Sequence, residues 1–185
     1  MVSWTDLLLP AAASTGLVFI ASSLVHMVFQ WHKPDYRALA SEDATRQAIR
    51  AGHPTPGQYV MPHCGEMKQA AEPAMQAKYR EGPNAVLYVG PNGPPAMGKL
   101  LGAWVVYSFL LSLAAGYVAK SALPAEAPYL TVFQVVGAAA FLGYAGQAAS
   151  DSIWKFKPWT VTFRSMVDGL IYAALTAGAF AWLWP

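Results

Sequence analysis

Residues 100–119 read LLGAWVVYSFLLSLAAGYVA, an uncharged run that decides the fold of this chain. A helix of this length rises about 30 Å, which is the thickness of the hydrocarbon core of a bilayer. Three other runs share its length and apolar character, at 7–30, 129–150 and 165–184. The sequence therefore predicts an all-α polytopic membrane protein with four transmembrane helices.

The charge between these runs is gathered in one insertion, residues 31–99, which holds 8 of the 12 Lys/Arg and 6 of the 10 Asp/Glu. Charged residues are only 12% of the chain and hydrophobic residues 55%, so a soluble domain of this composition would expose large apolar patches. We expect helix 1 within residues 1–30, a cap at 31–99 and helices 2–4 within 100–185. The net charge of +2 does not indicate a nucleic-acid partner.

The insertion carries the signals of a folded cap rather than of a linker. Ser41 and two acids predict the start of a helix that ends at Gly52, and a second helix is predicted at 73–81, between Pro73 and Gly82. Residues 57–61 and 85–90 read as short strands that could pair. A small α+β cap follows between helices 1 and 2.

Basic residues indicate the orientation of the chain. The insertion and the third connection, taken as 151–164, contain eleven Lys/Arg, whereas the opposite side has Lys120 and the amino terminus. Because positively charged loops stay cytoplasmic, we expect residues 31–99 in the cytoplasm and both termini outside. Residues 1–6 carry an acid and no base, so the first run is expected to remain as a spanning helix and not to act as a signal peptide.

Four polar residues of the apolar runs share one depth near the predicted cytoplasmic end: His26, Gln147, Asp151 and Asp168. Ionisable groups in membrane helices usually face inward and pair, so these residues could line a path for a proton or a small solute. The alternative is structural. Asp168 lies four residues after Arg164, where it could pair with that residue or reach headgroup water.

Small residues recur at four-residue spacing on helices 2 and 3, a pattern that lets helix backbones approach closely. It indicates either packing within one bundle or self-association and docking on a larger complex. The residues are Ser108, Ser112, Gly116, Ala139, Gly143, Gly146 and Ser150.

A third candidate lies in the cap, where Met61, His63 and Cys64 offer ligands suited to a soft metal. Their spacing does not match a structural zinc site, and the single cysteine excludes both an intramolecular disulfide and a multi-cysteine site. A turn with an incidental free cysteine is the favoured interpretation. No cofactor and no catalytic motif is predicted.

Several short segments resemble, as a set, small uncharacterised bacterial four-helix inner-membrane proteins with a helix, a cap and three further helices. The resemblance implies topology and bacterial origin, and it carries over no site residues and no activity. The segments are SLVHM at 23–27, WHKPDY at 31–36, GQYVMP at 57–62, GPPAMGK at 93–99, DSIW at 151–154 and DGLIY at 168–172.

The leading hypothesis is a non-enzymatic protein of the bacterial inner membrane, an oligomeric scaffold or an accessory subunit of a membrane complex. Its expected partners are the lipid bilayer and itself or other membrane subunits, without nucleic acid. The alternative is a proton or small-solute transporter or channel that uses the polar cluster, and a weaker third is a membrane enzyme with its site in the cap. Convergence of the four polar residues on a cavity would favour transport.

Overall fold

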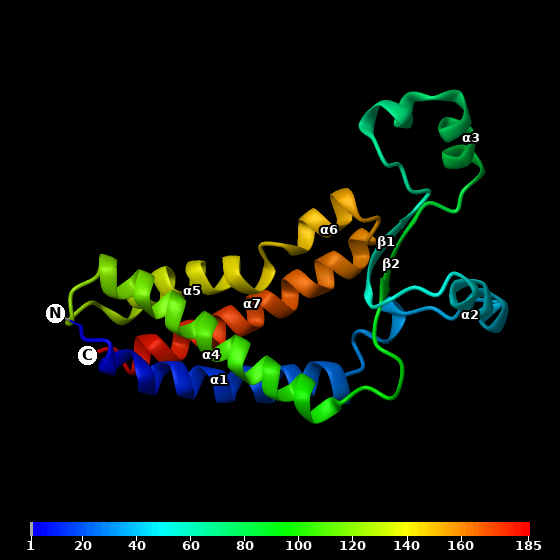
Figure 1. Cartoon of the computed structure of the whole chain (residues 1–185). Coiled ribbons are helices and arrows are strands. Elements are labelled where there is room, and N and C mark those ends of the chain that lie inside the picture. The colour runs from blue at the N-terminus through cyan, green and yellow to red at the C-terminus, as the bar shows by residue number, and fades with distance from the viewer. Residues whose placement is uncertain (1) are drawn as a thin grey trace. The chain divides into compact units, whose positions relative to one another are not determined.

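The computed structural model describes residues 2–185, and they form two compact units. The first, here called the bundle unit, comprises the residues up to Tyr36 together with Ala96–Ser152 and Lys157–Pro185. The second, called the cap unit, comprises Arg37–Pro95 and Ile153–Phe156. Figure 1 shows the helices of the bundle unit lying side by side, with both chain termini at one end.

Four helical segments are long and apolar enough to cross a membrane, as predicted. The length and composition of these helices indicate a multi-pass membrane protein. The segments are Thr5–Val28, Met97–Ala122, Tyr129–Trp154 and Trp159–Trp182.

The first segment begins with a 3-10 turn, Thr5–Leu7, continues as α1 (Leu8–Ser23) and ends in a π-helical turn, Leu24–Val28. The second is a single helix, α4 (Met97–Ala122). The third consists of α5 (Tyr129–Ala145) and α6 (Ala148–Trp154), and the fourth is α7 (Trp159–Trp182).

The last two segments approach each other more closely in sequence than predicted, because α6 runs past residue 150 and α7 begins directly after Pro158. The connection taken as 151–164 is thus reduced to 155–158, and Asp151 and Arg164 both lie in helices. Hydroxyl-bearing residues in this stretch favour a loop by composition, but in the structure their hydroxyls form hydrogen bonds between α6 and α7. Thr162 bonds the Ser152 hydroxyl at 2.5 Å and the Ala148 carbonyl at 3.3 Å.

The interior of the bundle is apolar toward the termini. A buried cluster there includes Leu7, Val132, Val136 and Phe180, contributed by the first segment, α5 and α7. Phe180 packs against α4 where the chain has Gly116, since a Cβ at that position would lie 2.5 Å from the Phe180 ring. The absence of a side chain at Gly116 on α4 thus leaves room for the large Phe180 ring of α7.

From its middle to the opposite end, the interior carries buried hydroxyls and one carboxylate. The Ser14 hydroxyl donates to Ser112 at 2.9 Å, which joins α1 to α4, and the Thr176 hydroxyl donates to the backbone of its own helix. We call this the site end, and it bears the chain reversal of residues 29–36 and the connection 155–158. The buried polar residues are Ser14, Thr15, Ser22, Ser108, Ser112, Thr162, Asp168 and Thr176.

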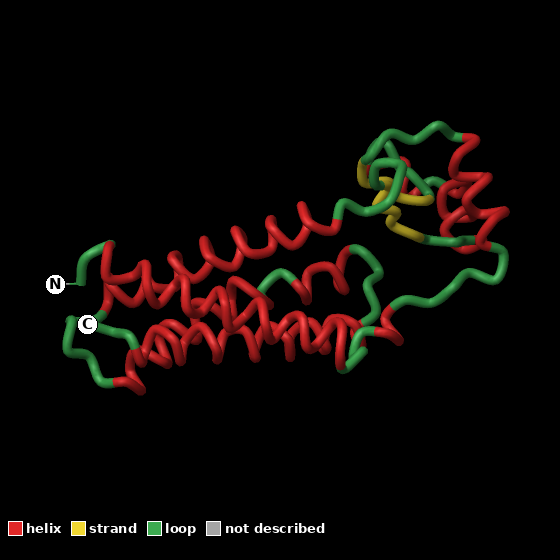
Figure 2. The backbone as a smooth tube through the Cα atoms, turned by 90° about the horizontal axis from the view of Figure 1, so that it is seen from below, coloured by secondary structure: helices red, strands yellow, loops and turns green. Residues whose placement is uncertain are grey.

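The cap unit contains the predicted elements in the predicted order: α2 (Glu42–Ala51), β1 (Gly57–Met61), α3 (Pro73–Glu81) and β2 (Ala85–Val89). The strands pair antiparallel with Gly57 opposite Val89 (yellow in Figure 2). A 3-10 turn at Met67–Ala71 was not predicted. None of residues 37–95, all of which the structure describes, is buried.

Candidate functional site

His26 is placed by the π-helical turn that ends the first spanning segment. In this turn the Phe29 amide donates to the Leu24 carbonyl at 2.9 Å, five residues back instead of four. Such turns are rare and recur at functional sites, because the extra residue changes which side chains face the neighbouring helices.

His32 is brought back onto His26 by a reversal of the chain. Gln30 adopts a positive φ of 48°, and a 3-10 turn follows at Lys33–Asp35, with Pro34 supplying a fixed φ. The two imidazole rings stack with centroids 4.6 Å apart and an interplanar angle of 25°.

A chain of hydrogen-bonded ionisable groups connects this reversal to α7. The His32 ring lies between two carboxylates, with Nε2 at 2.6 Å from Asp168 Oδ2 and Nδ1 at 2.6 Å from Asp35 Oδ2. The other oxygen of Asp35 forms an ion pair with Arg164 of α7. The short segment 32–35 is therefore fastened to α7 at two points, Arg164 and Asp168.

Asp168 is buried and Asp35 is half-buried, but both carboxylate side chains are shielded from solvent, with side-chain exposures of 3% for Asp35 and 8% for Asp168. Burial by itself raises the pKa of Asp35, but hydrogen bonds from His32 and Arg164, and the positive charge of Arg164, outweigh it and hold the pKa below its ordinary value. Asp35 is therefore an anion at neutral pH, and it neutralises the guanidinium of Arg164.

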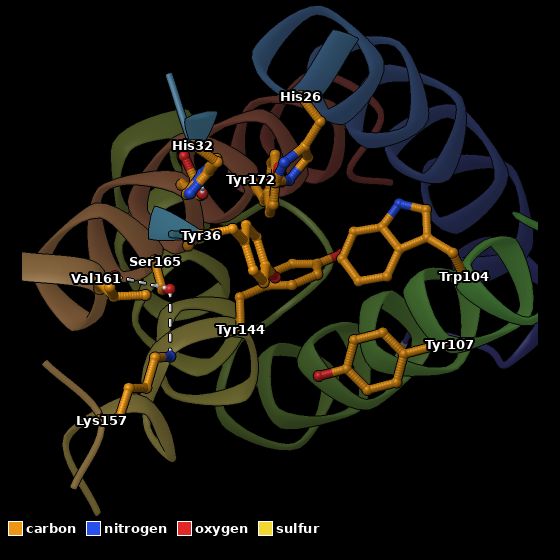
Figure 3. Close-up of a pocket in the computed structure, with 12 residues that line it drawn as sticks. His26, His32, Tyr36, Trp104, Tyr107, Tyr144, Lys157, Val161, Ser165 and Tyr172 are labelled. Atoms are coloured by element: carbon orange, nitrogen blue, oxygen red, sulfur yellow. Dashed lines mark hydrogen bonds and ion pairs between the residues drawn. The ribbon is translucent and has the colours of Figure 1, made fainter. Parts of the chain in front are cut away.

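A cavity of about 340 Å³ opens beside this chain, and every residue lining it belongs to the bundle unit. Aromatic rings form much of its wall. Tyr172 lies edge-on to Trp104 and to Tyr144, with centroids 5.9 and 5.5 Å away (Figure 3). The Lys157 ammonium lies across the wall at 3.5 Å from the Ser165 hydroxyl.

Two residues that line this cavity carry a buried polar atom without a hydrogen-bond partner in the part of the chain that the structure describes. The atoms are Asp168 Oδ1 and the phenol oxygen of Tyr172. Buried polar groups are nearly always satisfied, so two unsatisfied atoms on residues that line one cavity indicate a site for a polar occupant.

The stacked histidines separate this cavity from a second, more open hollow of about 350 Å³. His26, His32 and Tyr36 line both, and Gln30 and Lys33 line the second. His26 is itself exposed, so its ring is accessible from outside the bundle. The imidazoles thus stand at the entrance of the inner cavity.

Of the four predicted polar residues, the structure brings two together at the cavity, His26 and Asp168. Gln147 is exposed and Asp151 lies in α6, and neither lines the cavity. The physical reason is the helix break between α5 and α6, which abolishes the common face expected of residues four apart on a continuous helix. Asp168 also pairs with His32 rather than with Arg164.

Sequence reasoning missed His32, Asp35 and Arg164 as members of the site. The signal was present in the segment WHKPDY at 31–36, where a histidine and an acid surround a proline directly after a membrane segment. That segment was predicted to be part of the cap, so its two polar side chains were not considered as partners for a membrane helix.

The small residues of helices 2 and 3 lie in or near contacts within the bundle. Ser108, Ser112 and Gly116 are buried, and a Cβ at Gly143 would lie 2.8 Å from the Leu111 side chain. Gly146 ends α5 at the break. Ala139 and Ser150 are half-buried.

The segment 61–64 follows β1 in the cap unit. The Cys64 thiol donates to the Glu66 carbonyl at 2.9 Å, and His63 is exposed. A group of three His, Cys, Asp or Glu side chains whose ligand atoms could share a metal ion occurs within residues 2–185 at His26, His32 and Asp168.

Comparison with protein families, with curated proteins and with solved structures finds no match to this chain.

Proposed function

We propose that this chain is a bacterial inner-membrane protein that binds a small polar solute in the cavity at its site end and carries it through the polar half of the bundle. The observation that carries the proposal is Asp168, a buried carboxylate on a membrane helix with one oxygen bonded to His32 and the other without a partner. Such groups are costly in a membrane and typically mark a substrate or ion pathway.

The interior beyond Asp168 supports a path open to one side. Buried hydroxyls continue from the cavity to the middle of the bundle, where Ser14 meets Ser112. From there to the termini the interior is closed by apolar side chains around Phe180. A solute entering past the histidines would therefore reach the cavity and stop below the buried hydroxyls, as expected of a carrier in one of its two states.

The test is ligand-dependent stability of the purified protein, because a ligand at 100 times its Kd adds about 2.7 kcal/mol to the free energy of unfolding. A panel of inorganic ions, amines, amino acids and organic acids is scored for its effect on thermal unfolding. At least one compound should stabilise the wild type and the control Asp43→Asn, whose carboxylate is fully exposed in the cap unit, but not Asp168→Asn. If every compound acts alike on all three proteins, the cavity is not a solute site.

A second candidate, an accessory subunit of a membrane complex, is favoured by the surface of the cap unit. Its apolar side chains remain exposed, including Leu39 at 61%, Met67 at 93% and Tyr88 at 64%. We propose that these side chains contact another membrane subunit, since the small residues of helix 2 are buried inside the bundle. A lone monomer in native mass spectra from both mild detergent and nanodiscs would contradict this.

The basic residues support a cytoplasmic cap with both termini in the periplasm. Cys64 is the only cysteine of the chain, so its thiol reports the side on which the cap lies. An impermeant maleimide should label Cys64 in inside-out vesicles and not in intact spheroplasts. Ser3→Cys in a Cys64→Ser background should give the opposite pattern, and labelling of Cys64 in spheroplasts would reverse the proposed orientation.

A further inference from the structure

The geometry points to a divalent transition-metal ion of the Zn²⁺ type, bound by His26, His32 and Asp168, as the occupant of the site end. The ion is the solute of the proposed carrier. Only its movement through the protein rests on the proposed function. Binding itself is a property of three side chains that the structure brings together.

The three side chains each offer one ligand atom, and these atoms all lie within 4.8 Å of one another. Ligands of one tetrahedral Zn²⁺ at about 2.0–2.1 Å stand roughly 3.3 Å apart. The His32 Nε2···Asp168 Oδ2 distance of 2.6 Å must therefore open by less than about 1 Å. His26, on a single exposed turn, supplies the remaining adjustment.

An independent observation is the free oxygen of Asp168. Its Oδ1 is buried and has no hydrogen-bond partner among the described residues, and the whole side chain is only 8% exposed. When an ion binds His32 Nε2, the hydrogen bond between that nitrogen and Asp168 Oδ2 is given up, and Oδ1 offers the ion a second carboxylate oxygen. The desolvation cost of such an oxygen is recovered when a cation binds it.

Asp35 and Arg164 provide the outer support that metal-binding histidines normally have. His32 Nδ1 lies 2.6 Å from Asp35 Oδ2, and Arg164 holds the other oxygen of that carboxylate. A histidine that donates one ring N–H to a carboxylate has its other nitrogen directed at the metal and made more basic. Here that other nitrogen is Nε2, the atom that faces Asp168.

The ligand types select the class of ion. Imidazole suits Zn²⁺, Cu²⁺, Fe²⁺ and Ni²⁺, whereas Mg²⁺ and Ca²⁺ prefer oxygen ligands throughout. Three protein ligands leave a fourth position, which would face the cavity that Tyr144 and Tyr172 also line. The exposed side of His26 gives the ion a way in from the second hollow.

The test is titration of the purified full-length protein in detergent with Zn²⁺, and with Co²⁺ to record the visible absorption of the bound ion. The wild type should bind one ion. His26→Ala and Asp168→Asn should weaken binding by tenfold or more, and His63→Ala in the cap unit should leave the affinity unchanged. Far-ultraviolet circular dichroism checks that each variant keeps its helices, and the exposed His26 is the position least able to affect folding.

Asp35→Asn separates the outer support from the ligands. It should keep one ion per chain and lower the affinity by about 10–100-fold. The expected result is a Co²⁺ absorption spectrum identical to that of the wild type, with the midpoint of the Co²⁺ titration at a higher ion concentration. An unchanged affinity in this variant would overturn the role given to Asp35.

The inference is overturned if the folded wild type binds no Zn²⁺, or if His63→Ala abolishes binding while His26→Ala does not. Proteoliposomes loaded with a zinc-sensitive dye distinguish its failure from that of the proposed function. Zinc that is bound but never reaches the dye refutes carriage and leaves the metal site standing. A different solute that depends on Asp168, with no zinc bound, refutes the metal site and leaves the solute pocket standing.

Discussion

Gly169, next to Asp168 in α7, gives the sharpest test of how the site is positioned. A Cβ added there would lie 2.7 Å from the Ala145 Cβ, closer than such atoms approach in real proteins, and 3.3 Å from the Ala145 backbone nitrogen, which is a tight contact. Gly169→Ala must therefore push α5 away from α7. Gly178 in the same helix has its nearest neighbour, the Tyr129 hydroxyl, at 3.9 Å, so Gly178→Ala has room and serves as the matched control.

The two substitutions share the helix-propensity gain of alanine over glycine, about 1 kcal/mol. Only Gly169→Ala adds the overpacking cost, typically about 1–3 kcal/mol. We therefore expect Gly178→Ala to be neutral or stabilising. Gly169→Ala should unfold with a free energy about 1–3 kcal/mol below that of the control, measured by denaturation in mixed detergent micelles.

The double variant Gly169→Ala with Ala145→Gly moves the methyl group from α5 to α7 and removes the 2.7 Å contact. It should recover a large part of the lost stability, which a double-mutant cycle reports as a coupling energy. The reasoning is refuted if Gly169→Ala and Gly178→Ala are equally stable, or if the second substitution gives no recovery.

Two further predictions concern the bundle interior. Phe180 is fully buried, so Phe180→Ala should lower the free energy of unfolding, measured in micelles, by about 3–5 kcal/mol. Trp182 is 84% exposed in the structure, so Trp182→Ala should change the same free energy by much less. Ser112→Ala removes the acceptor of one hydrogen bond from Ser14, but the Ser14 hydroxyl keeps the Ala11 carbonyl at 3.0 Å as acceptor. The free energy of unfolding should therefore fall by only about 0.6 kcal/mol. A fall of several kcal/mol would show that the pair does more than join two helices.

Much of the fold was predictable because local chemistry determines it. Span length and the absence of charge identify the four membrane segments. In the cap, proline and glycine mark the ends of α3 at Pro73 and Gly82, and both strands were predicted to within one residue. The sequence also left open that these two strands pair, and the structure shows that they do.

The candidate site was only half predictable, because its pairs join residues far apart in sequence. His32 and Asp168 are separated by 136 positions, and Asp35 and Arg164 by 129. No periodicity marks such a contact, and the hydrophilic segment 31–36 resembles the insertion that follows it. The break after Ala145 was equally hidden, because residues 129–150 read as one apolar run.

The π-helical turn at Leu24–Val28 gives the first membrane helix one place where it can lose a residue. A π-helical turn holds one residue more than an α-helix places in the same turn. Deleting one of its residues other than His26 would let the turn close as a regular α-helix and would keep His32 and Asp35 in nearly the same phase toward Asp168 and Arg164. A deletion within the regular helix α1 would instead rotate everything after it by about 100° around the helix axis and shift it by about 1.5 Å. The first membrane helix thus carries its own reserve of length directly before the site.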